Sequence, residues 1–149
     1  MPSEEAHIRL AVRNQGTLDY LATEVDKHAE WVATVAFYKA LHVVEAVFAR
    51  DKAIGHGRDH GPRHQYLKRT NRYQHIWKNY WNLWRASTVA RCLEDNGHVH
   101  GSFAEYMTPD QVLDRLVKGN LQQVQLSARR FLSAASVIAL GLPPLKPKS

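Results

Sequence analysis

The chain has 149 residues, 44% of them apolar, with four Trp, six Tyr and four Phe. This length and composition fit one folded domain, and they exclude a disordered chain or two domains of ordinary size. The net charge of +6 and nine histidines favour an anionic partner such as a nucleic acid or a nucleotide. The single cysteine, Cys92, excludes an internal disulfide and a cysteine-based zinc site.

Apolar residues recur at helical spacing along the whole chain, without the alternation that is typical of strands. The pattern predicts a first helix over about residues 4–25, capped by Ser3, and a second that begins after Asp26 and ends near Lys52. No apolar run approaches the roughly 20 residues that span a bilayer, and the first residues are acidic rather than basic. We therefore expect a cytoplasmic protein with no membrane association.

The second helix has polar residues within its apolar stripe. At about 100° per residue, one face carries Trp31, Val35, Tyr38, His42, Glu45 and Ala49. A buried carboxylate needs a partner, because leaving it unpaired costs several kcal/mol or its charge. We expect that His42 and Glu45 either satisfy each other together with a basic residue or line a wet cleft with Tyr38. In the structural alternative, Arg91, Glu45 and Tyr38 are mutual partners.

Residues 55–64 form a predicted loop rich in glycine and charge, and Pro62 marks the start of a short helix that ends at Thr70 or Asn71. The free backbone N–H groups after Pro62 would form an anion site that fits phosphate. The side chains expected there are Arg58, His60 and Arg63. The alternative is a solvated loop with no ligand.

The same loop has histidines spaced by four, which suggests a metal site. Ligands at that spacing meet on one ion when they lie on a continuous helix, and glycine and proline interrupt the helix here. We therefore expect no metal and no cofactor. The histidines are His56, His60 and His64.

Two further long helices are predicted. The first covers residues 73–95 and ends at Asn96-Gly97, and residues 98–107 connect it to the second. Thr108 begins a capping box with Gln111, and the helix continues to about residue 138 with a kink near Gly119-Asn120. The sum is an all-α, up-and-down bundle of four long helices and one short helix. It forms a single domain over residues 1–141, followed by a short Pro/Lys tail over residues 142–149.

Three segments carry a resemblance to a known family. They are FYKALHVVEAVFA (37–49), HGPRHQYL (60–67) and YWNLWRASTVAR (80–91). Together they resemble the HEPN superfamily, particularly its small bacterial and archaeal members, which have Phe-Tyr-x-x-Leu-His-x-x-Glu on the second helix, His-x-x-Arg after a loop, and a later aromatic helix with Ser and Arg. The resemblance covers residues 6–131 and implies a HEPN-like bundle.

The resemblance also implies an activity. Many HEPN proteins are metal-independent ribonucleases that act as homodimers, in which an Arg and a His with four to six residues between them meet at the two-fold axis. Histidine then acts as general acid or base, and arginine stabilises the charged phosphorane. Four stretches have such a spacing: Arg50 to His56, Arg58 to His64, Arg69 to His75 and Arg91 to His98.

Position favours Arg91 and His98 as the catalytic pair, because the family motif lies at the end of a late helix and in the turn that follows. Cys92 departs from the polar residue that often follows the arginine, whereas Arg50 has Asp51 after it and ranks second. The implied function is RNA cleavage or RNA binding, in a toxin or defence role with a cognate antitoxin. The alternatives are a non-catalytic module that binds a nucleotide or a protein, and a helical subunit of a ribonucleoprotein complex.

Overall fold

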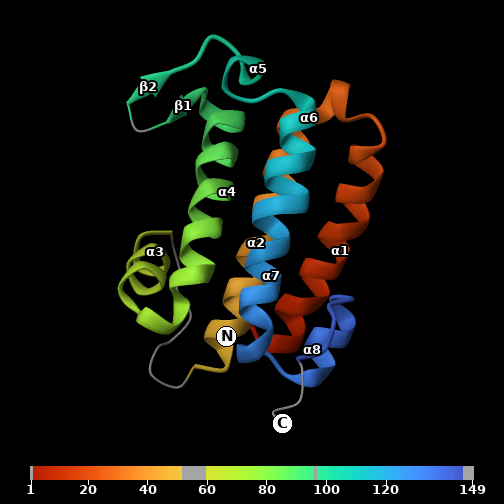
Figure 1. Ribbon diagram of the computed structural model, residues 1–149, viewed down its shortest axis with the longest axis vertical. Helices are drawn as coiled ribbons and strands as arrows, with labels where there is room; N and C mark the ends of the chain where they lie inside the picture. The colour runs from red at the N-terminus through yellow and green to blue at the C-terminus, as the bar shows by residue number, and fades with distance from the viewer. Residues whose placement is uncertain (1, 52–59, 96, 146–149) are drawn as a thin grey trace.

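The computed structural model describes residues 2–51, 60–95 and 97–145. The expectation of an all-helical fold is confirmed apart from one short hairpin. Four long helical segments lie side by side, each running opposite to the one before it (Figure 1). They are α1 (Glu4–Ala22), α2 (Val25–Ala49), α4 (Gln74–Cys92) and a final segment of α6 (Pro109–Gln111), η2 (Val112–Leu121) and α7 (Gln122–Ala128).

Shorter elements close the two ends of this bundle (Figure 1). At one end lie β1 (Glu94–Asp95), β2 (His98–Val99) and α5 (Phe103–Tyr106). At the other end lie η1 (Asn71–Tyr73), η3 (Arg129–Phe131) and α8 (Ala134–Ala139), whereas α3 (His60–Arg69) packs against the side of α4. The sequence signals for helix α3 placed its start two residues too late, at Pro62.

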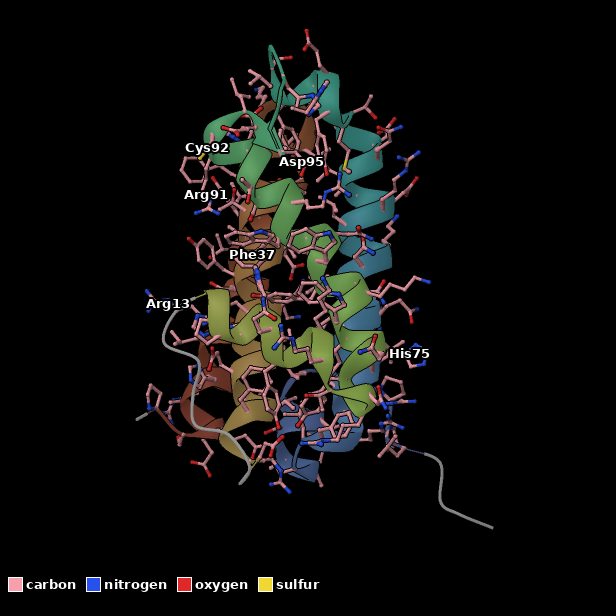
Figure 2. The ribbon with its side chains drawn as sticks, turned by 90° about the vertical axis from the view of Figure 1, so that its left-hand side faces the viewer. Arg13, Phe37, His75, Arg91, Cys92 and Asp95 are labelled. Carbon is pink, nitrogen blue, oxygen red and sulfur yellow. The ribbon has the colours of Figure 1, made fainter. Side chains whose placement is uncertain are left out.

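Helix α2 is the centre of the core, since it packs against α1, α4, η2 and α7. Its length and composition would also allow it to cross a membrane, but 72% of its most apolar window is buried inside the bundle. In the middle of the bundle, the ring of Phe37 contacts those of Tyr80 and Trp84, each with centroids 5.5 Å apart (Figure 2). Burial of this helix against α1, α4 and the final long segment therefore accounts for its hydrophobicity.

The stripe expected on α2 is only partly right. Glu45 is buried and His42 half-buried, but Trp31 is 61% exposed and Tyr38 also faces solvent. The side that packs inward is lined by small and aliphatic residues, which let neighbouring backbones approach closely. These residues include Val32, Ala36, Ala40, Val43 and Val47.

The predicted helix starts at Ser3 and Thr108 are confirmed. The Ser3 hydroxyl accepts a hydrogen bond from the Ala6 N–H at 3.1 Å. Thr108 and Gln111 form the full reciprocal capping box. The start of α2 differs from the prediction. The helix begins at Val25, and His28, three residues further on, has non-helical backbone angles. Asp26 is consequently inside the helix rather than its cap.

The end of α4 was predicted wrongly. The helix ends at Cys92, because Leu93 adopts the left-handed conformation with φ of 56° while its N–H bonds to the Val89 carbonyl. The chain then reverses in a hairpin in which Glu94 pairs with Val99 and Asp95 with His98. Strands of two residues are too short to show an alternating pattern, so periodicity gave no sign of them.

The segment η2 is a ten-residue π-helix, with backbone hydrogen bonds from residue i+5 to residue i. It explains an irregular step in the apolar pattern, because Leu116 and Leu121 are five residues apart and both are buried. A regular α-helix would have turned Leu121 away from the core. The expected kink at Gly119-Asn120 is therefore a stretch of wider helix.

The last predicted helix was too long. It ends at Phe131, where Leu132 is extended and Ser133 caps a separate helix, α8. The Ser133 N–H donates to the Glu4 carboxylate at 2.9 Å, which attaches this turn to the start of α1. Leu142, at the start of the tail, is buried.

Lys39 is a buried cation between α1 and α2, with only 3% of its surface exposed. Its amino group donates to Gln15 Oε1 at 2.5 Å. Burial lowers the pKa of Lys39 to about 8, and the carboxylate of Asp19 opposes this change. The folded chain therefore holds this proton less tightly than the unfolded chain does.

We expect this lysine to make stability rise with pH. Between pH 7.5 and 9.5 the unfolded chain binds more protons at Lys39, so the free energy of unfolding should increase by about 2 kcal/mol. Urea denaturation across this range measures it. Lys39→Met should remove the increase, and an equal slope in both proteins would contradict the assignment.

Candidate functional site

A buried ion pair joins α2 to α3. Arg63 Nε donates to Glu45 Oε1 at 2.6 Å, and the two side chains are 6% and 5% exposed. Glu45 thus has the basic partner that the sequence required, but that partner is Arg63. The expected network of Glu45 with Arg91 and Tyr38 was wrong, because Arg91 lies at the far end of α4 and is exposed.

His42 adjoins this pair. Burial lowers the pKa of His42, with a smaller lowering by Arg63 and an opposing effect of Glu45. His42 Nδ1 lies 3.2 Å from His7 Nδ1 on α1, so one ring must donate a proton that the other accepts. A neutral His42 fits both observations.

An aromatic wall closes the cluster on the side of α4. The ring of His64 meets that of Trp84 edge-on at 4.9 Å and those of Trp77, Tyr80 and Trp81 at 5.6 to 5.8 Å. Burial raises the pKa of Tyr80, while the neighbouring Arg63 opposes the rise. Glu45, Arg63, His42 and His64 are therefore packed between α1, α2, α3 and α4.

The structure brings only some of the predicted phosphate ligands together. Arg63 is engaged inside the protein with Glu45, and Tyr38 faces solvent on α2. His60 begins α3, but its side chain lies outside the described residues, as do Arg58 and His56. In the described part of the chain, no three His, Cys, Asp or Glu side chains are grouped to hold a metal.

Arg91 lies in the last turn of α4 near one end of the bundle (Figure 2). Its Nε donates to the Ser87 carbonyl at 3.1 Å, and its guanidinium lies over the Trp84 ring at 5.6 Å from the centroid. The side chain is exposed, so its remaining N–H groups face solvent. Arg91 is therefore oriented by its own helix and available to an anion.

His98 lies on β2, in the hairpin that directly follows α4. Its ring meets that of His100 at 4.6 Å with an interplanar angle of 70°. The N–H of His100 donates to the carbonyl of Leu93 at 2.8 Å. Because Leu93 is two residues after Arg91, this hydrogen bond holds His100 beside the end of α4. The predicted pair thus lies at one end of the bundle, in one short segment.

A second ion pair holds the hairpin. Arg85 on α4 donates from Nε to both oxygens of Asp95, at 3.0 and 3.1 Å, and from Nη2 to Oδ2 at 2.5 Å. These hydrogen bonds hold the pKa of Asp95 below its ordinary value, with smaller contributions from His100 and His98. Asp95 therefore stays ionised next to the two imidazoles.

Sequence reasoning missed His100, Asp95 and Arg85. The signal for His100 was present in His-Val-His, because residues two apart in an extended chain lie on the same side. The Arg85–Asp95 pair spans a helix end and a hairpin that the helical pattern did not predict.

Comparison of the chain with protein-family models, curated proteins and solved structures gives no match.

The buried ion pair of Glu45 and Arg63 leads to a prediction about stability. Arg63→Met should lower the free energy of unfolding by about 3–5 kcal/mol, because it removes the positive charge beside a buried carboxylate. The double variant Glu45→Leu, Arg63→Met should recover most of that loss, since neither of the two positions then carries a buried charge. Urea denaturation measures both, and a loss below about 1 kcal/mol in the single variant would contradict the argument.

Proposed function

We propose that the protein is a HEPN-like domain that binds RNA and cleaves its phosphodiester bonds without a metal. The proposed site consists of Arg91 with His98 and His100, and it is completed across a homodimer. The observation that carries the proposal is the contact between the two imidazole rings, at 4.6 Å, on the segment that follows the exposed Arg91.

The chemistry needs two proton-transfer groups. One imidazole takes the proton of the ribose 2'-hydroxyl as that oxygen attacks the adjacent phosphorus, and a protonated imidazole gives a proton to the departing 5'-oxygen. The products are a 2',3'-cyclic phosphate and a free 5'-hydroxyl. Histidine is the side chain best suited to both roles near neutral pH. The carboxylate of Asp95, which Arg85 pairs, lies near both rings.

Arginine supplies the electrostatic part. Negative charge develops on the phosphate oxygens during attack, and a guanidinium that is already oriented stabilises it without reorganisation. Arg91 meets this requirement, because the Ser87 carbonyl and the Trp84 ring hold its side chain while its outer N–H groups stay exposed. A surface site of this kind also leaves room for a second copy of the chain.

The alternative of a non-catalytic module that binds through Tyr38, His42 and Glu45 has less support. The negative charge of Glu45 is neutralised by Arg63, and Tyr38 points away to solvent. That cluster has the character of a structural connection.

Cleavage of RNA oligonucleotides in the presence of EDTA tests the proposal. Arg91→Ala, His98→Asn and His100→Asn should each lower the cleavage rate by about 100-fold or more, which is the usual loss when a proton-transfer group is removed. Substitution of a 2'-deoxy residue at the cleaved position should stop the reaction. Arg13→Ala and His28→Asn remove the same kinds of side chain from exposed or half-exposed places on α1 and α2 and should cleave normally.

A mixture of Arg91→Ala and His98→Asn chains tests the dimer. If Arg91 of one copy works with His98 of the other, each mixed dimer keeps one intact site and activity returns. The proposal fails if the unaltered protein leaves RNA intact, or if the three site variants cleave as fast as the two controls.

A further inference from the structure

A separate pocket of about 320 Å³ lies at the opposite end of the bundle from the hairpin. The end of α2 contributes Arg50, η1 contributes Arg72, and η3 contributes Arg130 and Phe131. Antiparallel neighbours bring these three helix ends together, although they are far apart in the sequence (Figure 1). Its residues have no part in the proposed cleavage site.

Acidic groups neutralise part of this arginine cluster. Arg72 donates from Nη2 to Asp51 Oδ2 at 2.5 Å, and Arg50 lies 3.5 Å from the Glu4 carboxylate. Arg130 donates to the Arg72 carbonyl at 3.3 Å, and it has no carboxylate partner among the residues that the structure describes. Its charge is therefore available to a ligand.

Asp51 sets the geometry of the pocket wall. Its Oδ2 accepts hydrogen bonds from the Tyr73 hydroxyl at 2.6 Å and from the Tyr66 hydroxyl at 3.3 Å, in addition to that from Arg72. Burial and the hydrogen bond to Asp51 raise the pKa of Tyr73 to about 12. Because Asp51 engages one nitrogen of Arg72, the other guanidinium N–H groups are left for a further acceptor.

An aromatic ring forms the other wall. The Phe131 ring packs edge-on against Tyr73 at 5.0 Å, and the guanidinium of Arg130 lies over Phe131 at 4.8 Å from its centroid. A second pocket of about 240 Å³ adjoins the first, because Arg72 and Arg130 line both, and His75 and Arg129 extend it. The combined surface has cations of fixed orientation beside a flat apolar ring.

We propose that this arginine pocket binds a phosphate ester, with Arg130 and Arg72 on the phosphate oxygens and Phe131 beside the attached organic group. Guanidinium groups match phosphate oxygens in geometry and stay charged at every physiological pH. A mononucleotide and the 5'-phosphate of an RNA offer the same chemistry. The inference does not depend on the cleavage proposed for the other end.

Isothermal titration of the full chain with AMP, inorganic phosphate and adenosine tests the assignment. AMP should bind saturably and more tightly than phosphate alone, and adenosine should not bind measurably. Arg130→Ala should lower the affinity for AMP at least fivefold. This side chain is exposed and makes one hydrogen bond to the backbone, so the fold should be retained. Arg50→Ala should also lower the affinity for AMP.

Arg115→Ala is the matched control, because it removes an exposed arginine from η2 with the same change in net charge. Its affinity for AMP should be within twofold of that of the unaltered chain. A short RNA with and without a 5'-phosphate identifies the source: tighter binding of the phosphorylated RNA than of AMP indicates an RNA end, and equal binding indicates a nucleotide. Absence of saturable binding by AMP and by both RNAs, or equal weakening in Arg115→Ala and Arg130→Ala, would overturn the proposal.

Discussion

The buried pair of Glu45 and Arg63 is the interaction on which the arrangement of α2, α3 and α4 depends. Removing two charges from water is costly, and only a close, well-oriented contact offsets that cost. The contact fixes the register of α3 against α2, and His64 then meets the tryptophans of α4. A short helix of only ten residues is thereby held in one position that its modest apolar surface would not specify.

This pair also removes one arginine from the positive charge that is available at the surface. Arg63 is neutralised inside the bundle, whereas Arg91 is exposed at one end and Arg130 at the other. The separation follows from the up-and-down course of the chain, because the end of α4 and the ends of α2 and η3 lie at opposite poles (Figure 1). Net charge alone indicates an anionic partner, and the fold places Arg91 and Arg130, one at each proposed site, at opposite ends of the bundle.

Local signals in the sequence were sufficient for much of the fold. Ser3 and Thr108 act through hydrogen bonds within their own first turn, so their residue types predicted the helix starts correctly. The hairpin after Leu93 could not be predicted this way, because it depends on a left-handed backbone at a leucine and on Arg85 about two helix turns earlier. The sequence indicated that Glu45 needs a cationic partner. Which cation it would be, Arg63, depends on how α3 packs against α2. The arginine pocket was hidden for the same reason, since residues 50, 72 and 130 meet only through the tertiary fold.

The π-helical stretch sets how the final segment responds to a change in its length. Ten residues of i+5 bonding let Leu116 and Leu121 both face inward, and Gly119 fits there because a β-carbon would lie 3.1 Å from the Asp114 carbonyl oxygen. Because i+5 bonding takes up more residues per turn than i+4 bonding, loss of one residue from this stretch is absorbed by a return toward α-helical winding. Loss of one residue at the start of α7 would instead rotate everything downstream by about 100°. Val124 and Ala128 would then leave the core together, and Arg130 would swing away from Arg72. The final segment therefore tolerates a change of length in its π-helical part and not in α7.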